Sequence, residues 1–194
     1  MHLRDILRVH LDQLSDPSGR GLRIVETGTI RGDEERYAQD DGWSTVHMAQ
    51  WAEEHFERDD SRRPLIISID LEIDTAQRVL ERHDLLPYVD LVQGHSVDIL
   101  GSMIADGLGG HDVDLAYLDS DNDPTLILCE FLLVSRLVRP GGIILIDDVD
   151  PSSKSGARKG HAVMPWLDAR QQEYSIVGRA GAGYSTNVLV TRKP

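Results

Sequence analysis

The stretch "IVETGTIRGDEERYAQDDGWSTVHMA", residues 24–49, holds the end of a predicted β-strand, a glycine turn and the start of a predicted helix. The strand is short, apolar and β-branched, and it ends in Glu26-Thr27-Gly28-Thr29. The helical pattern begins only at Gly42-Trp43-Ser44, after a polar segment over residues 30–41. Strand, glycine turn and helix in this order are typical of nucleotide-binding α/β folds, and residues 30–41 are expected to form a flap inserted between turn and helix.

The rest of the chain alternates between the periods of strands and helices. Helical patterns run through residues 46–56, 76–80 and 124–138, and apolar runs predict strands at residues 22–27, 64–70, 88–94, 113–119 and 142–148. Strands that alternate with helices predict right-handed βαβ units. Residues 173–180 and 185–192 predict an antiparallel hairpin. The expected fold class is α/β, Rossmann-like, with a mostly parallel seven-stranded sheet, helices on both faces and this C-terminal antiparallel hairpin.

Length and composition set limits on organisation and partners. The 194 residues predict one domain over residues 1–194, with an amphipathic helix within residues 1–20 that could pack against a second copy in a homo-oligomer. The formal net charge of −13 argues against nucleic acid or an anionic membrane as the main partner. Cys129 is the single cysteine, which excludes an internal disulfide and favours a reducing, cytoplasmic location. No apolar run approaches the length of a membrane span.

Carboxylates stand at nearly every predicted strand end. In open parallel sheets, ligands bind beyond these ends, near the point where the strand order reverses. Like charges raise one another's pKa values unless a cation or donor group offsets them. The pattern therefore predicts a positively charged ligand or a metal ion at this edge. The acidic residues are Glu26, Asp70, Asp119, Asp147 and Asp148.

The first turn discriminates between nucleotide cofactors. A dinucleotide fold needs G-x-G-x-x-G, whereas this turn has only Gly28 before Gly32. Glu26 at the strand end would repel a diphosphate and would suit an ammonium or sulfonium group, which points to S-adenosylmethionine. Asp70 is placed to accept hydrogen bonds from a ribose diol. NAD and S-adenosylmethionine both carry that diol, so Asp70 alone does not choose between them.

The motifs from about residue 22 to residue 150 resemble a known family. The chain looks like a class I S-adenosylmethionine-dependent methyltransferase, and within that class like the metal-dependent catechol and sugar O-methyltransferase group. The resemblance rests on Glu26-Thr27-Gly28, Gly42-Trp43-Ser44, Asp70, Gly94-His95-Ser96, Asp119 and Asp147-Asp148. It implies that Ser44 caps the first helix and meets the methionine carboxylate, Asp70 the ribose and Ser96 the adenine. The implied cofactor-binding set is Glu26, Thr27, Gly28, Thr29, Ser44, Asp70, Ser96 and Asp119.

The same resemblance implies a divalent metal, held by Asp119, Asp147 and Asp148. Three carboxylates prefer a hard cation such as Mg²⁺, Mn²⁺ or Ca²⁺, of which Mg²⁺ is the expected one. Asp148 stands where the catechol group has Asn, and related sugar O-methyltransferases have an acidic pair there. The expected reaction is metal-assisted methyl transfer to a hydroxyl of a small molecule, a sugar or a natural-product phenol.

The general base of the resembled group is not in its usual place. The catechol enzymes have Lys three residues after the first metal Asp, and this chain has Asn122 there. Asn cannot take a proton, so a replacement is expected in the loop beyond Asp148, from His161, Lys154 or Lys159. His161 is the predicted base, because histidine changes charge near neutral pH.

Hydroxylation on a methyltransferase-like scaffold would require iron, and the histidines expected as iron ligands are lacking at these strand ends. Two other functions remain open at this point. One is an NAD-type oxidoreductase on a similar sheet, against which the missing fingerprint glycines count. The other is a catalytically silent cofactor-binding domain, which the Asn122 position favours. Titration with NAD and with S-adenosylmethionine would distinguish an oxidoreductase from a methyltransferase. A methyl-transfer assay over a panel of hydroxylated compounds would distinguish an active enzyme from a catalytically silent domain.

Overall fold

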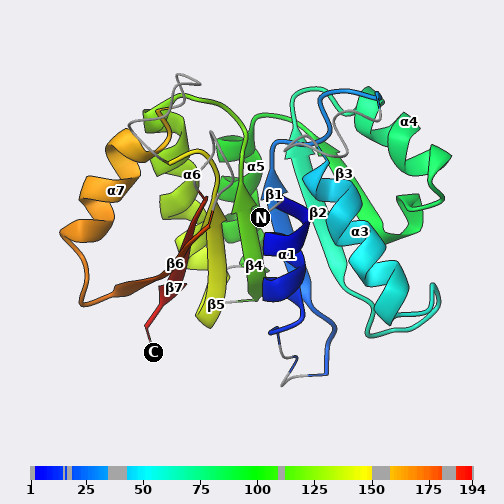
Figure 1. The fold of residues 1–194 in the computed structure, drawn as a ribbon, viewed down its shortest axis with the longest axis horizontal. Coiled ribbons are helices and arrows are strands. Elements are labelled where there is room, and N and C mark those ends of the chain that lie inside the picture. Colours follow the sequence, from blue (N-terminus) through cyan, green and yellow to red (C-terminus); the bar gives the residue numbers. More distant parts are fainter. Residues whose placement is uncertain are drawn as a thin grey trace.

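The fold is built on a seven-stranded sheet (Figure 1). The computed structural model describes residues 3–14, 16, 19–34, 43–108, 112–149, 158–180 and 187–193. Five strands pair in parallel, and the last two form an antiparallel hairpin whose second strand pairs with β5. The strands are β1 (Arg23–Thr27), β2 (Leu65–Asp70), β3 (Val89–Gln93), β4 (Val113–Leu118), β5 (Val138–Ile146), β6 (Tyr174–Ala180) and β7 (Asn187–Arg192), in the order β3-β2-β1-β4-β5-β7-β6. The predicted fold class is confirmed.

Helices cover both faces of the sheet, because the strand residues alternate between two apolar cores. Ile24 of β1 belongs to one core and its neighbour Val25 to the other. The first core contains α1 (Leu3–Leu11), α3 (Ser44–His55) and α4 (Asp74–Arg82). The second contains α5 (Ser96–Met103), α6 (Pro124–Leu137) and α7 (Gly160–Asp168). Two short helical segments complete the described elements, the 3₁₀ helix η1 (Leu86–Tyr88) and the π-helix η2 (Ile104–Leu108).

None of the helices in the described part of the chain is long and apolar enough to cross a membrane.

The strand order reverses between β1 and β4, and this fixes the position of the site. β2 and β3 follow β1 in one direction, whereas β4 and β5 lie on the other side of it. The carboxyl ends of the parallel strands share the upper edge in Figure 1. Ligands of such sheets bind beyond these ends at the reversal point. Glu26, Asp70, Asp119 and Asp147 all lie at this edge, at or directly after the ends of their strands.

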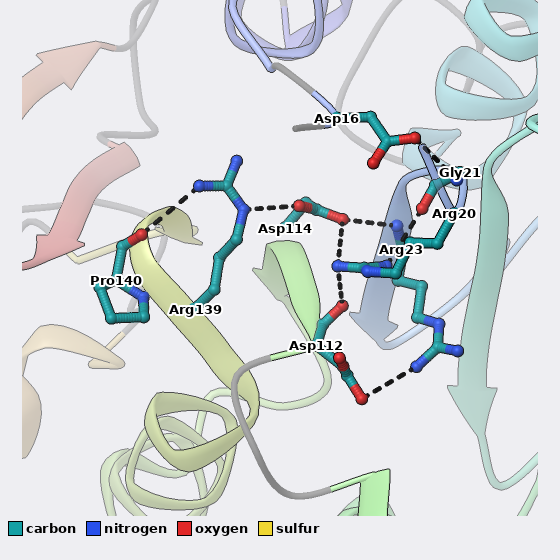
Figure 2. A network of polar contacts seen from close by, with 8 residues as sticks. All are labelled: Asp16, Arg20, Gly21, Arg23, Asp112, Asp114, Arg139 and Pro140. Carbon is teal, nitrogen blue, oxygen red and sulfur yellow. Dashed lines mark hydrogen bonds and ion pairs between the residues drawn. The ribbon is translucent and has the colours of Figure 1, made fainter. Parts of the chain in front are cut away.

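At the opposite edge, Asp114 joins the beginnings of three neighbouring strands (Figure 2). Its carboxylate is 2% exposed and accepts hydrogen bonds from Arg139 at 2.6 Å and from Arg20 at 3.2 Å. It also accepts the backbone N–H of Arg23 at 2.8 Å. Asp114 lies near the start of β4, and its partners precede or begin β1 and β5, so the network fixes the register of the strands that carry the site at their far ends.

We expect Asp114→Asn to lower the free energy of unfolding by about 2 kcal/mol, because charge-assisted hydrogen bonds to a buried carboxylate are worth more than neutral ones. Urea denaturation followed by circular dichroism measures this. Asp112→Asn is the matched control, since its carboxylate is 40% exposed and its ion pair with Arg23 has a distance of 3.3 Å. The control should cost less than about 1 kcal/mol. Equal losses in the two variants would contradict the role given to Asp114.

Candidate active site

The glycine turn after β1 is wedged between the ends of β2 and β4. Gly28 has a φ of 86° and donates its N–H to the carbonyl oxygen of Ile69 at 2.9 Å. A Cβ at Gly28 would lie 2.4 Å from the carbonyl oxygen of Asp119, so no other residue fits. The next residue, Thr29, donates its N–H to Asp70 Oδ2 at 2.9 Å. The turn and the acidic end of β2, predicted to hold one cofactor, are therefore joined directly.

Glu26 lies beneath this turn, with no exposed surface. Its carboxylate accepts hydrogen bonds from the hydroxyls of Ser44, of Thr45 at 2.5 Å and of Ser68 at 2.6 Å. Burial raises the pKa of Glu26 to about 7; the three hydroxyls lower it in part and the charge of Asp119 raises it further. Glu26 is therefore a buried acid poised near neutrality, and its predicted contact with a cofactor stays a prediction.

The predicted capping role of Ser44 is wrong. The helix α3 begins at Ser44 itself, and its N-cap is Trp43, whose side chain makes no capping hydrogen bond. The hydroxyl of Ser44 is directed to Glu26 because a buried carboxylate binds a donor more strongly than a backbone group does. Among the described residues, the N-cap side chain therefore leaves the first N–H groups of α3 without a cap, and such groups can bind an anionic group.

A second buried acid, Glu130, was missed by the sequence analysis. It lies in the middle of α6 with no exposed surface, and it accepts hydrogen bonds from Thr27 Oγ1 at 2.9 Å and from Ser96 Oγ. Burial raises the pKa of Glu130, and these hydroxyls and the charge of Lys159 oppose the rise only in part. The signal was present in "LILCEFLL", where one acid interrupts an apolar helix. Ser96 and Thr27, both predicted to bind cofactor, are engaged with Glu130.

The three acids predicted to bind a metal lie at one edge, but they do not converge as ligands. β4 and β5 end side by side. The backbone N–H of Asp119 donates to the carbonyl oxygen of Thr27 at 2.8 Å, which extends the pairing of β4 with β1 by one residue. Asp147 is 2% exposed, and the backbone of Asp148 has a left-handed conformation with a φ of 51°. Within the described residues, no group of three His, Cys, Asp or Glu side chains is arranged to hold a metal. The Nζ of Lys159 instead donates to Asp119 Oδ1.

His161, the predicted base, lies exposed in the first turn of α7, two residues after Lys159. Its backbone N–H donates a hydrogen bond to the carbonyl oxygen of Arg158 at 2.9 Å. Its role as base is a prediction that the structure does not test. Of the other two candidates, Lys154 lies outside the described residues, and Lys159 is the one that reaches the acidic edge.

The described part of the flap, residues 30–34, packs across the site edge. Arg31 donates to the carbonyl oxygen of Asp119 at 2.7 Å, and its guanidinium is 56% exposed. Trp43 Nε1 donates to the carbonyl oxygen of Gly32 at 2.9 Å, and the Trp43 side chain is buried. Trp43 therefore has a packing role here. Residues 35–41, with Arg36 and Tyr37, lie outside the described residues.

A shallow hollow lies beside the predicted adenine contact. It has a volume of about 410 Å³ and is lined by residues that open α5 and α6, among them His95, Asp98, Asp123 and Cys129. These helices follow β3 and β4, so the hollow lies on the carboxyl side of the sheet. A larger hollow of about 510 Å³, around Leu11, Trp51 and Phe56, lies away from the strand ends that carry the acids.

Comparison with known proteins agrees with this fold. The family described as "Methyltransferase domain" matches residues 40–149, which are 110 of the 194 residues. No curated protein matches the chain. Among solved structures, cofactor-bound Rv0187 from MTB is 16% identical with a TM-score of 0.62, and the alignment covers 97% of this chain and 90% of that one.

Two further similar structures contain bound ligands. The O-methyltransferase from Bacillus cereus, in complex with SAH, is 18% identical with a TM-score of 0.60, over 98% of this chain and 90% of its own. MycE from the mycinamycin biosynthetic pathway, in complex with Mg, SAH and mycinamycin VI, is 19% identical with a TM-score of 0.54, over 89% of this chain and 46% of its own. At such identities the likeness shows the fold. The family match covers more than half of the chain, so the chain belongs to the methyltransferase domain family, and its predicted class, a class I S-adenosylmethionine-dependent methyltransferase, is confirmed.

Proposed function

We propose that the chain moves a methyl group from S-adenosylmethionine to a hydroxyl of a small molecule, a sugar or a natural-product phenol. The observation that carries the proposal is the bond from Thr29 N–H to Asp70 Oδ2, 2.9 Å long, which joins the glycine turn to the acidic end of β2. A similar fold in a Bacillus cereus O-methyltransferase supports oxygen as the acceptor atom. We propose that the transfer takes place in the cytoplasm.

The chain's own residues would bind the cofactor along this edge. Asp70 Oδ1 accepts a bond from Glu72 N–H at 3.2 Å, and a carboxylate oxygen can accept a second one, so it has capacity for a ribose hydroxyl. The start of α3 offers N–H groups to a carboxylate. The hollow beside His95 offers a place for the adenine ring, next to Ser96.

Within the acceptor site, residues of this chain would orient the hydroxyl and take its proton. S-adenosylmethionine supplies an electrophilic methyl group: the sulfur–carbon bond breaks as the oxygen–carbon bond forms, and the hydroxyl proton leaves. His161 is the proposed proton acceptor, because it lies in the first turn of α7, two residues after Lys159, which reaches the acidic edge. Holding the two reactants in place can itself supply about 7–11 kcal/mol of the barrier reduction.

The divalent cation expected from the sequence, which was Mg²⁺, is not part of this proposal. Its oxygen ligands would be Asp119, Asp147 and Asp148, which suit a hard cation by chemistry. In this arrangement they do not fit one, since Asp119 is already bonded to the Lys159 ammonium. We therefore route no step of the reaction through a metal.

Calorimetric titration tests the cofactor. We expect S-adenosylmethionine to bind and NAD⁺ not to bind, and we expect Asp70→Asn to weaken binding by about 10-fold to 100-fold, the value of one charge-assisted hydrogen bond. The matched control is Asp74→Asn, an exposed acid in the first turn of α4, which should leave the affinity unchanged. Preference for NAD⁺ would instead support an oxidoreductase.

A second assay tests turnover. Transfer of labelled methyl to a panel of sugars and phenols is expected, in the presence of a chelator. Binding of S-adenosylmethionine without transfer to any member of the panel would contradict the proposal and support a cofactor-binding domain without turnover.

A further inference from the structure

Lys159 lies in an unusual position for a lysine. Its side chain is 2% exposed, whereas lysines are almost never buried unless they are paired. Its Nζ donates to Asp119 Oδ1, and its charge also acts on Glu130. The ammonium therefore binds at the end of β4, and its charge also reaches the buried acid of α6.

The backbone next to Lys159 is fixed by a close contact. A Cβ at Gly160 would lie 2.0 Å from the carbonyl oxygen of Val149, so the first residue of α7 can approach this point only as glycine. Val149 follows Asp148 and is itself buried. The start of α7 is thus packed against the segment that leaves β5, and Lys159 enters the site from a fixed backbone position.

The ion pair between Lys159 and Asp119 is costly to break, because the Lys159 ammonium is buried. Removing one partner of a buried ion pair costs about 3–5 kcal/mol, because the other charge is left unpaired. A divalent cation on Asp119 would have to displace the buried ammonium and leave it without that partner. A second cation, Arg31, approaches Asp119 Oδ1 at 4.0 Å and already binds its carbonyl oxygen.

We infer that the Lys159 ammonium is the resident cation of this edge and takes the place of a divalent metal on Asp119. In this arrangement Lys159 is a positioning residue: it holds the Asp119 carboxylate and, with Arg31, neutralises the end of β4 where the acceptor hydroxyl would approach. The inference rests on the proposed function only in naming this edge the acceptor side.

Titration with Mn²⁺, followed by electron paramagnetic resonance, tests the inference without turnover. Wild-type protein is expected to leave Mn²⁺ free, at stoichiometric and at millimolar concentrations. Lys159→Met, which keeps the length of the side chain and removes its charge, is expected to gain one Mn²⁺ site. The double variant Lys159→Met/Asp119→Asn is expected to lose that site again, and Lys159→Arg should not bind Mn²⁺.

The wild-type titration decides the question even if the methionine variant fails to fold. One Mn²⁺ bound by wild-type protein and lost in Asp119→Asn would overturn the inference, as would a folded Lys159→Met that binds none. Calorimetry with S-adenosylmethionine in chelator, on the same wild-type sample, keeps failure of this inference distinct from failure of the proposed function.

Discussion

Gly28→Ala is expected to lower the free energy of unfolding by about 2–5 kcal/mol and to weaken S-adenosylmethionine binding by at least about 100-fold. Two costs add up. Alanine at a φ of 86° costs about 1–2 kcal/mol relative to glycine. The new Cβ would also lie 2.4 Å from the Asp119 carbonyl oxygen, so the ends of β1 and β4 must separate.

Gly107 provides a control with the same backbone. It also has a φ of 86°, but nothing lies within 4 Å of the place where its Cβ would stand. Gly107→Ala therefore carries the conformational cost alone, about 1–2 kcal/mol, and should leave the cofactor affinity unchanged. Gly101→Ala, in α5 with open space around it, should be neutral or stabilising, since alanine favours helix.

Urea denaturation and calorimetry on the three variants separate the contributions. The difference between Gly28→Ala and Gly107→Ala measures the close approach of Gly28 to β4. If the two variants lost the same stability and both bound cofactor normally, the turn would have no special role and the assignment of this edge as the cofactor site would fail.

Periodicity was sufficient to predict the fold because the central strands β1, β4 and β5 are largely buried and give clear apolar runs. All seven strands were predicted within a few residues. The acids Glu26, Asp70, Asp119 and Asp147 were also correctly placed at or directly after the carboxyl ends of their strands. The helices α5 and α7 were not singled out. α5 has only eight residues, and α7 contains Pro165, so neither offers a long apolar period.

The site was predictable in position but not in detail. Adjacent strand ends follow from topology, so Asp70 and Asp119 were expected at one edge. What each side chain binds depends on contacts between residues far apart in sequence. Glu130 and Lys159 reach the site from α6 and from the start of α7, and no local pattern links them to Thr27 or to Asp119. Ser44 was predicted to cap α3 because the competing acceptor, Glu26, is 18 residues away.

The second large effect concerns Glu26→Gln and pH. Glu26 has a pKa of about 7 in the folded chain and 4.5 as the ordinary value. Between these values the folded state holds a proton that the unfolded state has lost, so this carboxyl's contribution to stability is full below pH 4.5 and is lost as pH rises through 7. Glutamine does not titrate. The free energy of unfolding of Glu26→Gln minus that of wild type should therefore rise by about 3 kcal/mol between pH 5 and pH 8.

Taking the difference between variant and wild type removes other groups that titrate in this range. His47 is one such group: burial, followed by the charge of Arg4, lowers its pKa to about 4, so its contribution is present above pH 6.5 and is lost as pH falls through 4. Because both proteins contain His47, its effect cancels in the difference. A difference that stays flat from pH 5 to pH 8 would show that Glu26 titrates as an ordinary carboxyl.

Ser68→Ala locates the origin of the effect. The Ser68 hydroxyl donates to Glu26 Oε2 at 2.6 Å and favours the ionised form, so its removal should move the titration of Glu26 to higher pH. A cationic ligand at this edge should do the opposite, since a positive charge near Glu26 favours the carboxylate. Saturation with S-adenosylmethionine should therefore lower the pH at which wild type diverges from Glu26→Gln, whereas saturation with the uncharged thioether product should lower it less. A buried acid that ionises when the sulfonium binds and regains its proton when the product forms would favour release of the product over release of the substrate.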